Sequence, residues 1–192
     1  MPIFWIGVAL AGFLVWKTDA ITAISDEIEV QLIPEDAFTR WDSLFRASSK
    51  THGVPWRWIK AVCWVESDLG RAASVKRGLE FPDDVEGSKS SDGKSWGLMQ
   101  VTLPTANDVR PGTTVAMLNN PVISVDCGAR VLARNMRAFP KDPTSVFRAY
   151  NGGLGFAKTV LGQRDTPAYA AKVISKIEMI QKKQPGNELE IG

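Results

Sequence analysis

The 192-residue sequence predicts a mainly α-helical fold with few or no strands, on three observations. Apolar side chains recur at intervals of three and four residues in several segments, which is typical of helices that bury one face. No segment alternates apolar and polar residues as a half-buried strand does. Gly and Pro stand near the ends of the periodic segments, where helices begin and end. Seven Trp and eight Phe supply bulky core material, so one main domain is expected.

The N-terminal segment differs from the rest of the chain, because residues 3–16 contain no charged side chain. Fourteen helical residues span about 21 Å, which is short of a hydrocarbon core of about 30 Å. That length fits an export signal, but no Lys or Arg precedes the run and the cleavage pattern at 18–20 is poor. Trp5 and Trp16 bracket the run, as interfacial aromatic residues do. We therefore favour an uncleaved membrane anchor over an export signal at 1–17, and a buried globular helix is the third interpretation.

The chain after this N-terminal hydrophobic helix divides into three further parts. Residues 18–37 are expected to form a linker or stalk, residues 38–184 the main domain, and residues 185–192 a frayed tail. In the main domain, the spacing of Phe38, Trp41 and Phe45 predicts a helix that ends near Gly53. A second helix is expected over 56–69, with Pro55 at its first turn and Gly70 as its C-cap. Residues 71–95 are polar and predict a long surface loop that could hold a small hairpin.

The second half of the domain is expected to be helical as well. A short helix over 101–110 would be interrupted by Pro104. Apolar residues at helical spacing then predict a long helix over 122–139 and a short one over 144–150. The last helix is defined by Tyr169, Val173, Ile177 and Ile180.

Composition excludes several classes of function. The formal net charge of +2 is too small to indicate a nucleic-acid-binding protein. Arg130, Arg134 and Arg137 recur at helical spacing, and they form either a solvated face or a contact with an anionic polymer. Cys63 and Cys127 lie far apart and the chain has one histidine, so no zinc site and no cofactor is expected. Buried free thiols are the default for the two cysteines, and a disulfide is the alternative.

Glu66 is the candidate catalytic residue. Ile59, Val62 and Cys63 precede it at helical spacing, so the carboxyl group shares the apolar stripe of its helix. It also lies in the last turn, where the helix dipole disfavours negative charge. Both effects raise the pKa of Glu66, which would make it a general acid near neutral pH. The alternative is a glutamate that merely ends a helix.

Two short motifs follow Glu66-Ser67 in order, namely Gly-Leu-Met-Gln at 97–100 and Ala-Tyr-Asn-Gly-Gly at 149–153. Together with Gly-Val-Pro at 53–55 and Tyr-Ala-Ala-Lys-Val at 169–173, this order resembles the soluble lytic transglycosylase family, which has a lysozyme-like fold. The resemblance covers roughly residues 40–175. Three motifs in the right order are specific, whereas each four-residue match alone is weak.

The resemblance implies a site and a reaction. Glu66 would be the catalytic acid and base that cleaves the β-1,4 bond between N-acetylmuramic acid and N-acetylglucosamine. Ser67 would be structural. The substrate-binding residues implied by the motifs are Gln100, Tyr150, Asn151, Met99 on the sub-site floor, and Ser91.

The number of carboxylates predicts the product. Two-carboxylate glycosidases need a partner about 5 to 9.5 Å from the acid, and Asp68 points to the opposite side of the helix. The C6 hydroxyl of the substrate would then attack, which leaves a 1,6-anhydromuramic end. However, the segment after Glu66 is longer than in the family and carries Glu80, Asp83, Asp84, Glu86 and Asp92. A carboxylate there could hold a water, as in a goose-type-like hydrolytic lysozyme.

The resemblance also implies the partners. They are peptidoglycan glycan strands and, through the N-terminal helix, a membrane, whereas no nucleic acid is required. We expect a bacteriolytic enzyme at the cell envelope, facing the periplasm, or in a virion membrane. It would open the wall locally for a phage ejection apparatus or a secretion or conjugation channel. A non-catalytic wall-binding scaffold of the same fold is the remaining class.

Overall fold

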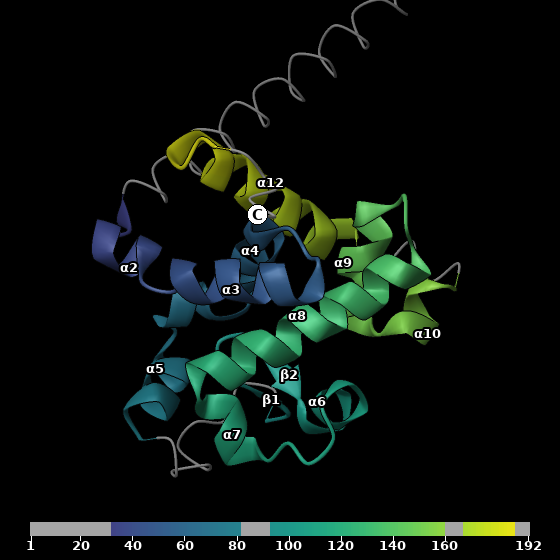
Figure 1. Ribbon diagram of the computed structural model, residues 1–192, viewed down its shortest axis with the longest axis horizontal. Coiled ribbons are helices and arrows are strands. Elements are labelled where there is room, and N and C mark those ends of the chain that lie inside the picture. The colour runs from purple at the N-terminus through teal and green to yellow at the C-terminus, as the bar shows by residue number, and fades with distance from the viewer. Residues whose placement is uncertain (1–31, 82–92, 160–166, 187–192) are drawn as a thin grey trace, which may run out of the picture. The chain divides into compact units, whose positions relative to one another are not determined.

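The computed structural model describes residues 32–81, 93–159 and 167–186 (Figure 1). The chain divides into two compact units, Met1–Phe38 and Thr39–Gly192. The expected anchor at 1–17 and most of the expected stalk lie outside the described residues. Across the three described ranges, no helix has both the length and the apolar character needed to cross a membrane. The elements are α2 (Glu35–Thr39), α3 (Asp42–His52), α4 (Trp56–Ser67), α5 (Ala73–Glu80), β1 (Ser95–Trp96), β2 (Val101–Thr102), α6 (Leu103–Val109), α7 (Val115–Asn119), α8 (Pro121–Ala138), α9 (Pro143–Gly152), α10 (Leu154–Ala157) and α12 (Pro167–Lys183).

Helix α4 is the central element of the second unit, and it packs against α12, α3 and α8 (Figure 1). Most of its residues are buried, which explains why its sequence is apolar on nearly every face. Its one buried lysine, Lys60, donates to Asp42 Oδ1 at 2.7 Å and to Gln184 Oε1 at 2.8 Å. Arg57 donates to the carbonyl oxygens of Gln184 and Gly186, both at 2.8 Å. Buried cations therefore fix the end of α12 on α4, because a charge is buried only when it is paired.

Two helix boundaries differ from the prediction. The single helix expected up to Gly53 is broken before Asp42, where Trp41 has a non-helical backbone and its Nε1 donates to Leu69 O at 3.0 Å. Helix α4 ends at Ser67 rather than at residue 69, and its C-cap is Asp68 and not Gly70. Ser67 explains this early end, since its Oγ donates to Cys63 O and accepts from Gly70 N. The predicted stop of α3 at Gly53 is confirmed, with φ of 67°.

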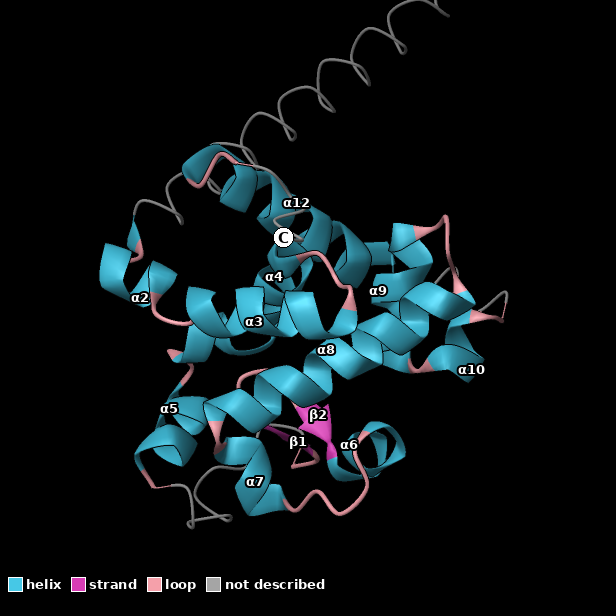
Figure 2. Cartoon of the chain, in the orientation of Figure 1, coloured by secondary structure: helices cyan, strands magenta, loops and turns pink. Residues whose placement is uncertain are grey.

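The segment expected to be a long polar loop begins with a helix, α5, so that part of the prediction is wrong. Val75 and Gly78 are buried on α5, which packs against α7. The exposed charged residues Lys76, Arg77 and Glu80 lie between and after them, so this short apolar face is not recognisable in the sequence. Beyond residues 82–92, which are not described, β1 and β2 form an antiparallel hairpin in which Ser95 pairs with Thr102. Figure 2 shows this hairpin in magenta among α6, α7 and α8.

The second half of the domain follows the prediction more closely. The expected helices at 122–139 and 144–150 are confirmed as α8 and α9, and the last predicted helix is α12. Residues 101–110 begin as a strand, and Pro104 lies in the first turn of α6, where it does not interrupt the helix. The short helices α7 and α10 were not predicted, because four or five residues carry too little periodicity.

The turn between the two strands lies against α7 and α8. Gly97 has φ of +72°, and a Cβ atom there would meet Leu118 O at 1.9 Å. On α8, a Cβ atom at Gly128 would meet the Met99 side chain at 2.6 to 2.8 Å. Both glycines therefore allow a close approach that any side chain would prevent. The motif at 97–100 is thus held by backbone contact with two helices.

The two cysteines are buried free thiols, as expected. Burial raises the pKa of Cys63 to about 12, although its Sγ shares a hydrogen bond with Ser67 Oγ, which lowers the pKa. That thiol stays protonated at neutral pH, which argues against a role as a nucleophile.

Candidate active site

Glu66 lies in the last turn of α4, next to the end of the helix. Its carboxyl group accepts a hydrogen bond at Oε1 from the phenol of Tyr169, at 2.5 Å. Tyr169 comes from α12, 103 residues further along the chain. Burial and the nearby Glu66 raise the pKa of Tyr169 well above its ordinary value, so this phenol is a donor at neutral pH. The Oε1 atom of Glu66 is therefore held by a donor of the protein itself.

The backbone next to the acid is strained. Asp68 and Leu69 have φ of 52° and 55°, and Gln100, the third non-glycine residue with positive φ in the described part, has 45°. A left-handed backbone costs about 1–2 kcal/mol per non-glycine residue, and such residues concentrate at functional sites. Asp68 and Leu69 follow Glu66 in the chain, directly after α4, and Gln100 lines the pocket in front of it. Ser67, which is buried, holds the strained turn in place through its two hydrogen bonds.

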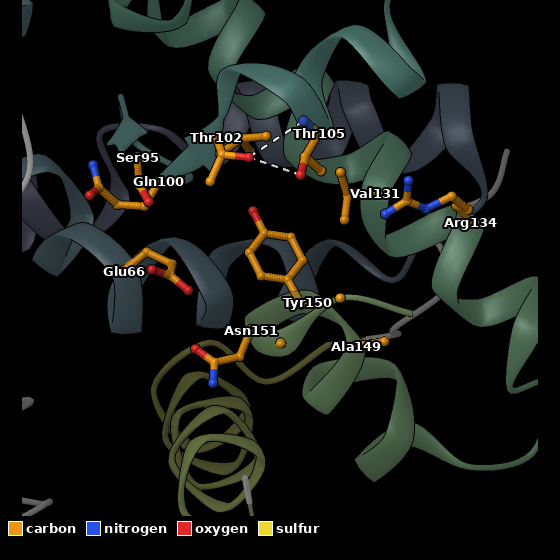
Figure 3. A pocket seen from close by; sticks show the side chains of 13 residues that line it. Glu66, Ser95, Gln100, Thr102, Thr105, Val131, Arg134, Ala149, Tyr150 and Asn151 are labelled. Atoms are coloured by element: carbon orange, nitrogen blue, oxygen red, sulfur yellow. Dashed lines mark hydrogen bonds between the residues drawn. The ribbon is translucent and has the colours of Figure 1, made fainter. Parts of the chain in front are cut away.

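A pocket of about 570 Å³ opens in front of Glu66 (Figure 3). The strands β1 and β2 and the turn between them contribute to it, together with the end of α4, the start of α6, the second half of α8 and the end of α9. A volume of this size accommodates a ligand of several hundred Å³, such as part of a saccharide chain. Its lining residues are Glu66, Ser95, Gln100, Val101, Thr102, Thr105, Val131, Arg134, Ala149, Tyr150, Asn151, Gly152 and Gly153.

Three of the residues implied by the motifs, Gln100, Tyr150 and Asn151, line this pocket together with Glu66. Tyr150 donates its phenol to Met99 O at 2.7 Å, and burial raises the pKa of Tyr150 well above its ordinary value. Gln100 donates its side-chain amide to Gly97 O at 2.8 Å, which closes the turn. The two motifs are therefore joined to each other by a hydrogen bond through the backbone of Met99.

The other two residues implied by the motifs are placed differently. The Met99 side chain is fully buried against Gly128 and is not among the residues that line the pocket. Its backbone carbonyl, rather than its side chain, contacts a lining residue. Ser91 lies outside the described residues, as does Asp92. Asp68 forms a salt bridge with Arg71 at 2.8 Å and does not line the pocket, although its left-handed backbone beyond the end of α4, rather than helical geometry, sets its direction.

Sequence reasoning missed several lining residues. Thr102 and Thr105 bond to each other through their hydroxyl groups at 2.9 Å, and their spacing is that of an N-cap pair. Arg134 belongs to the basic stripe that the sequence predicted, but nothing in the sequence distinguished it from Arg130 and Arg137. Tyr169 does not line the pocket, but its phenol contacts Glu66. The sequence predicted its helix, whereas this contact follows from the packing of α12 against α4.

No group of His, Cys, Asp and Glu within the described ranges has the arrangement of a metal site. Among the lining residues that the structure describes, Glu66 is the only carboxylate and Arg134 the only cation.

Three comparisons with known proteins complete the description of the site. The family model described as "Transglycosylase SLT domain" matches residues 43–173. A search of curated proteins gave no match. Among solved structures, the chain is similar to an inactive mutant of the lytic transglycosylase Slt from Pseudomonas aeruginosa, with 21% sequence identity and a TM-score of 0.60. That alignment covers 95% of this chain and 31% of the Slt chain, so this chain spans about a third of Slt.

Proposed function

Because the chain belongs to the transglycosylase SLT domain family, we propose that it is a peptidoglycan lytic transglycosylase with Glu66 as its catalytic acid and base. The fold is the lysozyme-like fold that it shares with Slt. The bond cleaved would be the β-1,4 bond between N-acetylmuramic acid and N-acetylglucosamine. Gln100, Tyr150 and Asn151 would bind the saccharide, since they line the pocket beside the acid.

The observation that carries this proposal is that Glu66 supplies the single carboxyl group among the described lining residues of the pocket. Those residues therefore offer no protein nucleophile of the kind that retaining glycosidases use. The Glu66 proton would pass to the glycosidic oxygen as the bond from that oxygen to C1 breaks. The C6 hydroxyl of the muramic acid would then form a bond to C1 and give its proton to the Glu66 carboxylate. The products are a free N-acetylglucosamine hydroxyl and a 1,6-anhydromuramic end.

Tyr169 would position the acid in this mechanism. Its phenol holds Oε1 at 2.5 Å, which fixes the rotation of the carboxyl group and directs Oε2 toward its substrate. The strained turn at Asp68 and Leu69 supports the same geometry from the helix end. Met99 would act through its backbone carbonyl, which orients the Tyr150 ring, rather than through its side chain.

We also propose that the apolar segment at 3–16 tethers the enzyme to a membrane of the cell envelope or virion. A tethered enzyme would cleave only the wall within its reach, as a phage ejection apparatus or a secretion channel requires. The support for this part is the uncharged run and its two flanking Trp residues in the sequence.

The test of the enzymatic proposal is digestion of purified peptidoglycan by the wild type and by Glu66→Gln. The variant keeps the size of the side chain and loses the proton donor, so lysis should fall by at least about 10²- to 10⁴-fold. Glu178→Gln is the matched control, since Glu178 is exposed on α12 and does not line the pocket. Near-normal lysis by a folded Glu66→Gln enzyme would reject Glu66 as the catalytic acid and with it this assignment. No lysis by the wild type would instead leave the non-catalytic scaffold as the explanation.

A further inference from the structure

Arg134 is the single cation among the described residues that line the pocket. It projects from α8 one turn after Val131, and Figure 3 shows its guanidinium group turned toward Val131, with Tyr150 between it and Glu66 in this view. The pocket therefore has an acid at one side and a permanent positive charge at the other. The cleavage chemistry uses the acid and leaves the cation without a role.

The protein leaves part of the Arg134 guanidinium group unsatisfied. Its Nε atom is buried and makes no hydrogen bond within the described part of the chain. Its nearest carboxylate is that of Asp108, 4.0 Å from Nη1, and the Asp108 side chain is 72% exposed. An exposed pair at this distance contributes little, because water screens it. The Arg134 side chain is 28% exposed, so the guanidinium group keeps accessible donors that Asp108 holds only weakly and that an acceptor in the pocket can use.

The neighbouring arginines of the same helix are arranged differently. Arg130 donates to Asp126 Oδ2 at 2.9 Å, and that carboxylate also pairs with His52 at 2.7 Å. Arg137 is exposed in the last turn of α8 and does not line the pocket. Of the basic stripe predicted from the sequence, Arg134 alone is positioned to touch a substrate.

We propose that Arg134 is a specificity residue that binds a carboxylate of the peptidoglycan strand. This inference rests on the proposed function, and it defines the substrate class as an anionic glycan rather than a neutral one. A guanidinium group binds a carboxylate through two parallel hydrogen bonds, which fixes the orientation as well as the charge of its partner. Such a carboxylate has two sources on a wall strand: the lactyl group of a muramic acid without peptide, or the stem peptide itself.

The test measures binding in the Glu66→Gln background, where the ligand is not cleaved. The ligands are peptidoglycan tetrasaccharides with and without stem peptides, each in its native form and with its carboxylates converted to amides. Arg134→Gln should weaken binding of a native ligand by about 10- to 100-fold, the range for a hydrogen bond to a charged group. It should change binding of the amidated ligand by less than about threefold, because that ligand has already lost the partner.

Two further variants separate this role from a structural one. Arg134→Lys keeps the charge without the planar fork and should recover part of the affinity. Arg137→Gln removes the same charge from the same helix outside the pocket and should bind every ligand as the wild type does. A loss of affinity for the native tetrasaccharide without stem peptides identifies the lactyl group as the source of the carboxylate. A loss for the peptide-bearing ligand alone identifies the stem peptide. Equal losses for native and amidated ligands, or no loss for either, would overturn the proposal.

The outcomes distinguish this inference from the proposed function. If the wild type fails to cleave sacculi but binding still depends on Arg134 and on the carboxylate, the enzymatic proposal is wrong and the carboxylate site stands. If sacculi are cleaved while Arg134→Gln binds both forms of each ligand as before, the specificity inference is wrong and the enzyme stands.

Discussion

Tyr169 and Glu66 are joined by a hydrogen bond of 2.5 Å, although 103 residues separate them in the sequence. The bond links the last helix of the domain to its central helix at the position where acid catalysis is proposed. The acid is therefore positioned by a residue from outside its own motif. The two helices pack closely along their length, so this contact depends on the complete fold.

Tyr169→Phe tests the positioning role of this phenol. The variant loses one hydrogen bond to Oε1 and no apolar contact, so we expect kcat to fall about tenfold with KM nearly unchanged. The pH–rate profile should also move to higher pH, because the carboxylate form of Glu66 has lost a donor. Steady-state kinetics on soluble peptidoglycan fragments, measured across about pH 4 to 9, gives both kcat and the pH–rate profile. An unchanged profile would show that the bond has no part in catalysis.

The nature of the cleaved ends separates the transglycosylase from a hydrolytic lysozyme. A pocket with Glu66 as its sole described carboxylate should give muropeptides that end in 1,6-anhydro-N-acetylmuramic acid. Mass spectrometry of digested sacculi detects this directly, since an anhydro end lacks one water relative to a reducing end. Asn or Gln replacements at Asp83, Asp84, Glu86 and Asp92 should leave turnover unchanged. Predominantly reducing ends, abolished by one of these replacements, would identify a carboxylate that positions water and would favour the goose-type-like mechanism.

The N-terminal segment should decide where the protein is found. Residues 3–16 carry no charge, so we expect the full chain to fractionate with membranes and to resist extraction by high salt. A chain that begins at residue 38 should remain in the soluble fraction and retain lysis of sacculi. N-terminal sequencing of protein from its native source gives the decisive comparison. A mature N-terminus near Ile21 would show cleavage of an export signal and reject the anchor.

Gly97→Ala should destabilise the domain by more than about 2 kcal/mol. A Cβ atom at this position would lie 1.9 Å from Leu118 O, and the backbone has φ of +72°, so neither the space nor the conformation allows a side chain. Gly155→Ala is the matched control, because a Cβ atom there meets nothing within 4 Å. Thermal unfolding followed by circular dichroism should show a large decrease in Tm for the first variant and little change for the second. Equal changes in Tm would mean that the backbone of the turn at 97–100 can shift to accommodate a Cβ atom.

The sequence by itself determined the main helices and which glutamate is the candidate acid. Long apolar periodicity is a local property, so α8, α9, α12 and most of α4 could be predicted from it. The glutamate at the end of an apolar helix, followed by two motifs in order, identified Glu66, Gln100, Tyr150 and Asn151 as candidates that line one pocket.

Only the tertiary structure decided which residues meet in front of the acid. Tyr169, Thr105 and Arg134 lie at the site because α12, α6 and α8 pack around α4 and the hairpin. Spacing along the sequence does not predict such long-range contacts. The family resemblance implied that Met99 forms a sub-site floor, yet its side chain is buried in the core against Gly128, where the absence of a side chain leaves room for it. The same reason explains α5, whose short apolar face becomes visible only against α7. Periodicity encodes which face of a helix is apolar, whereas packing decides what that face and its neighbours touch.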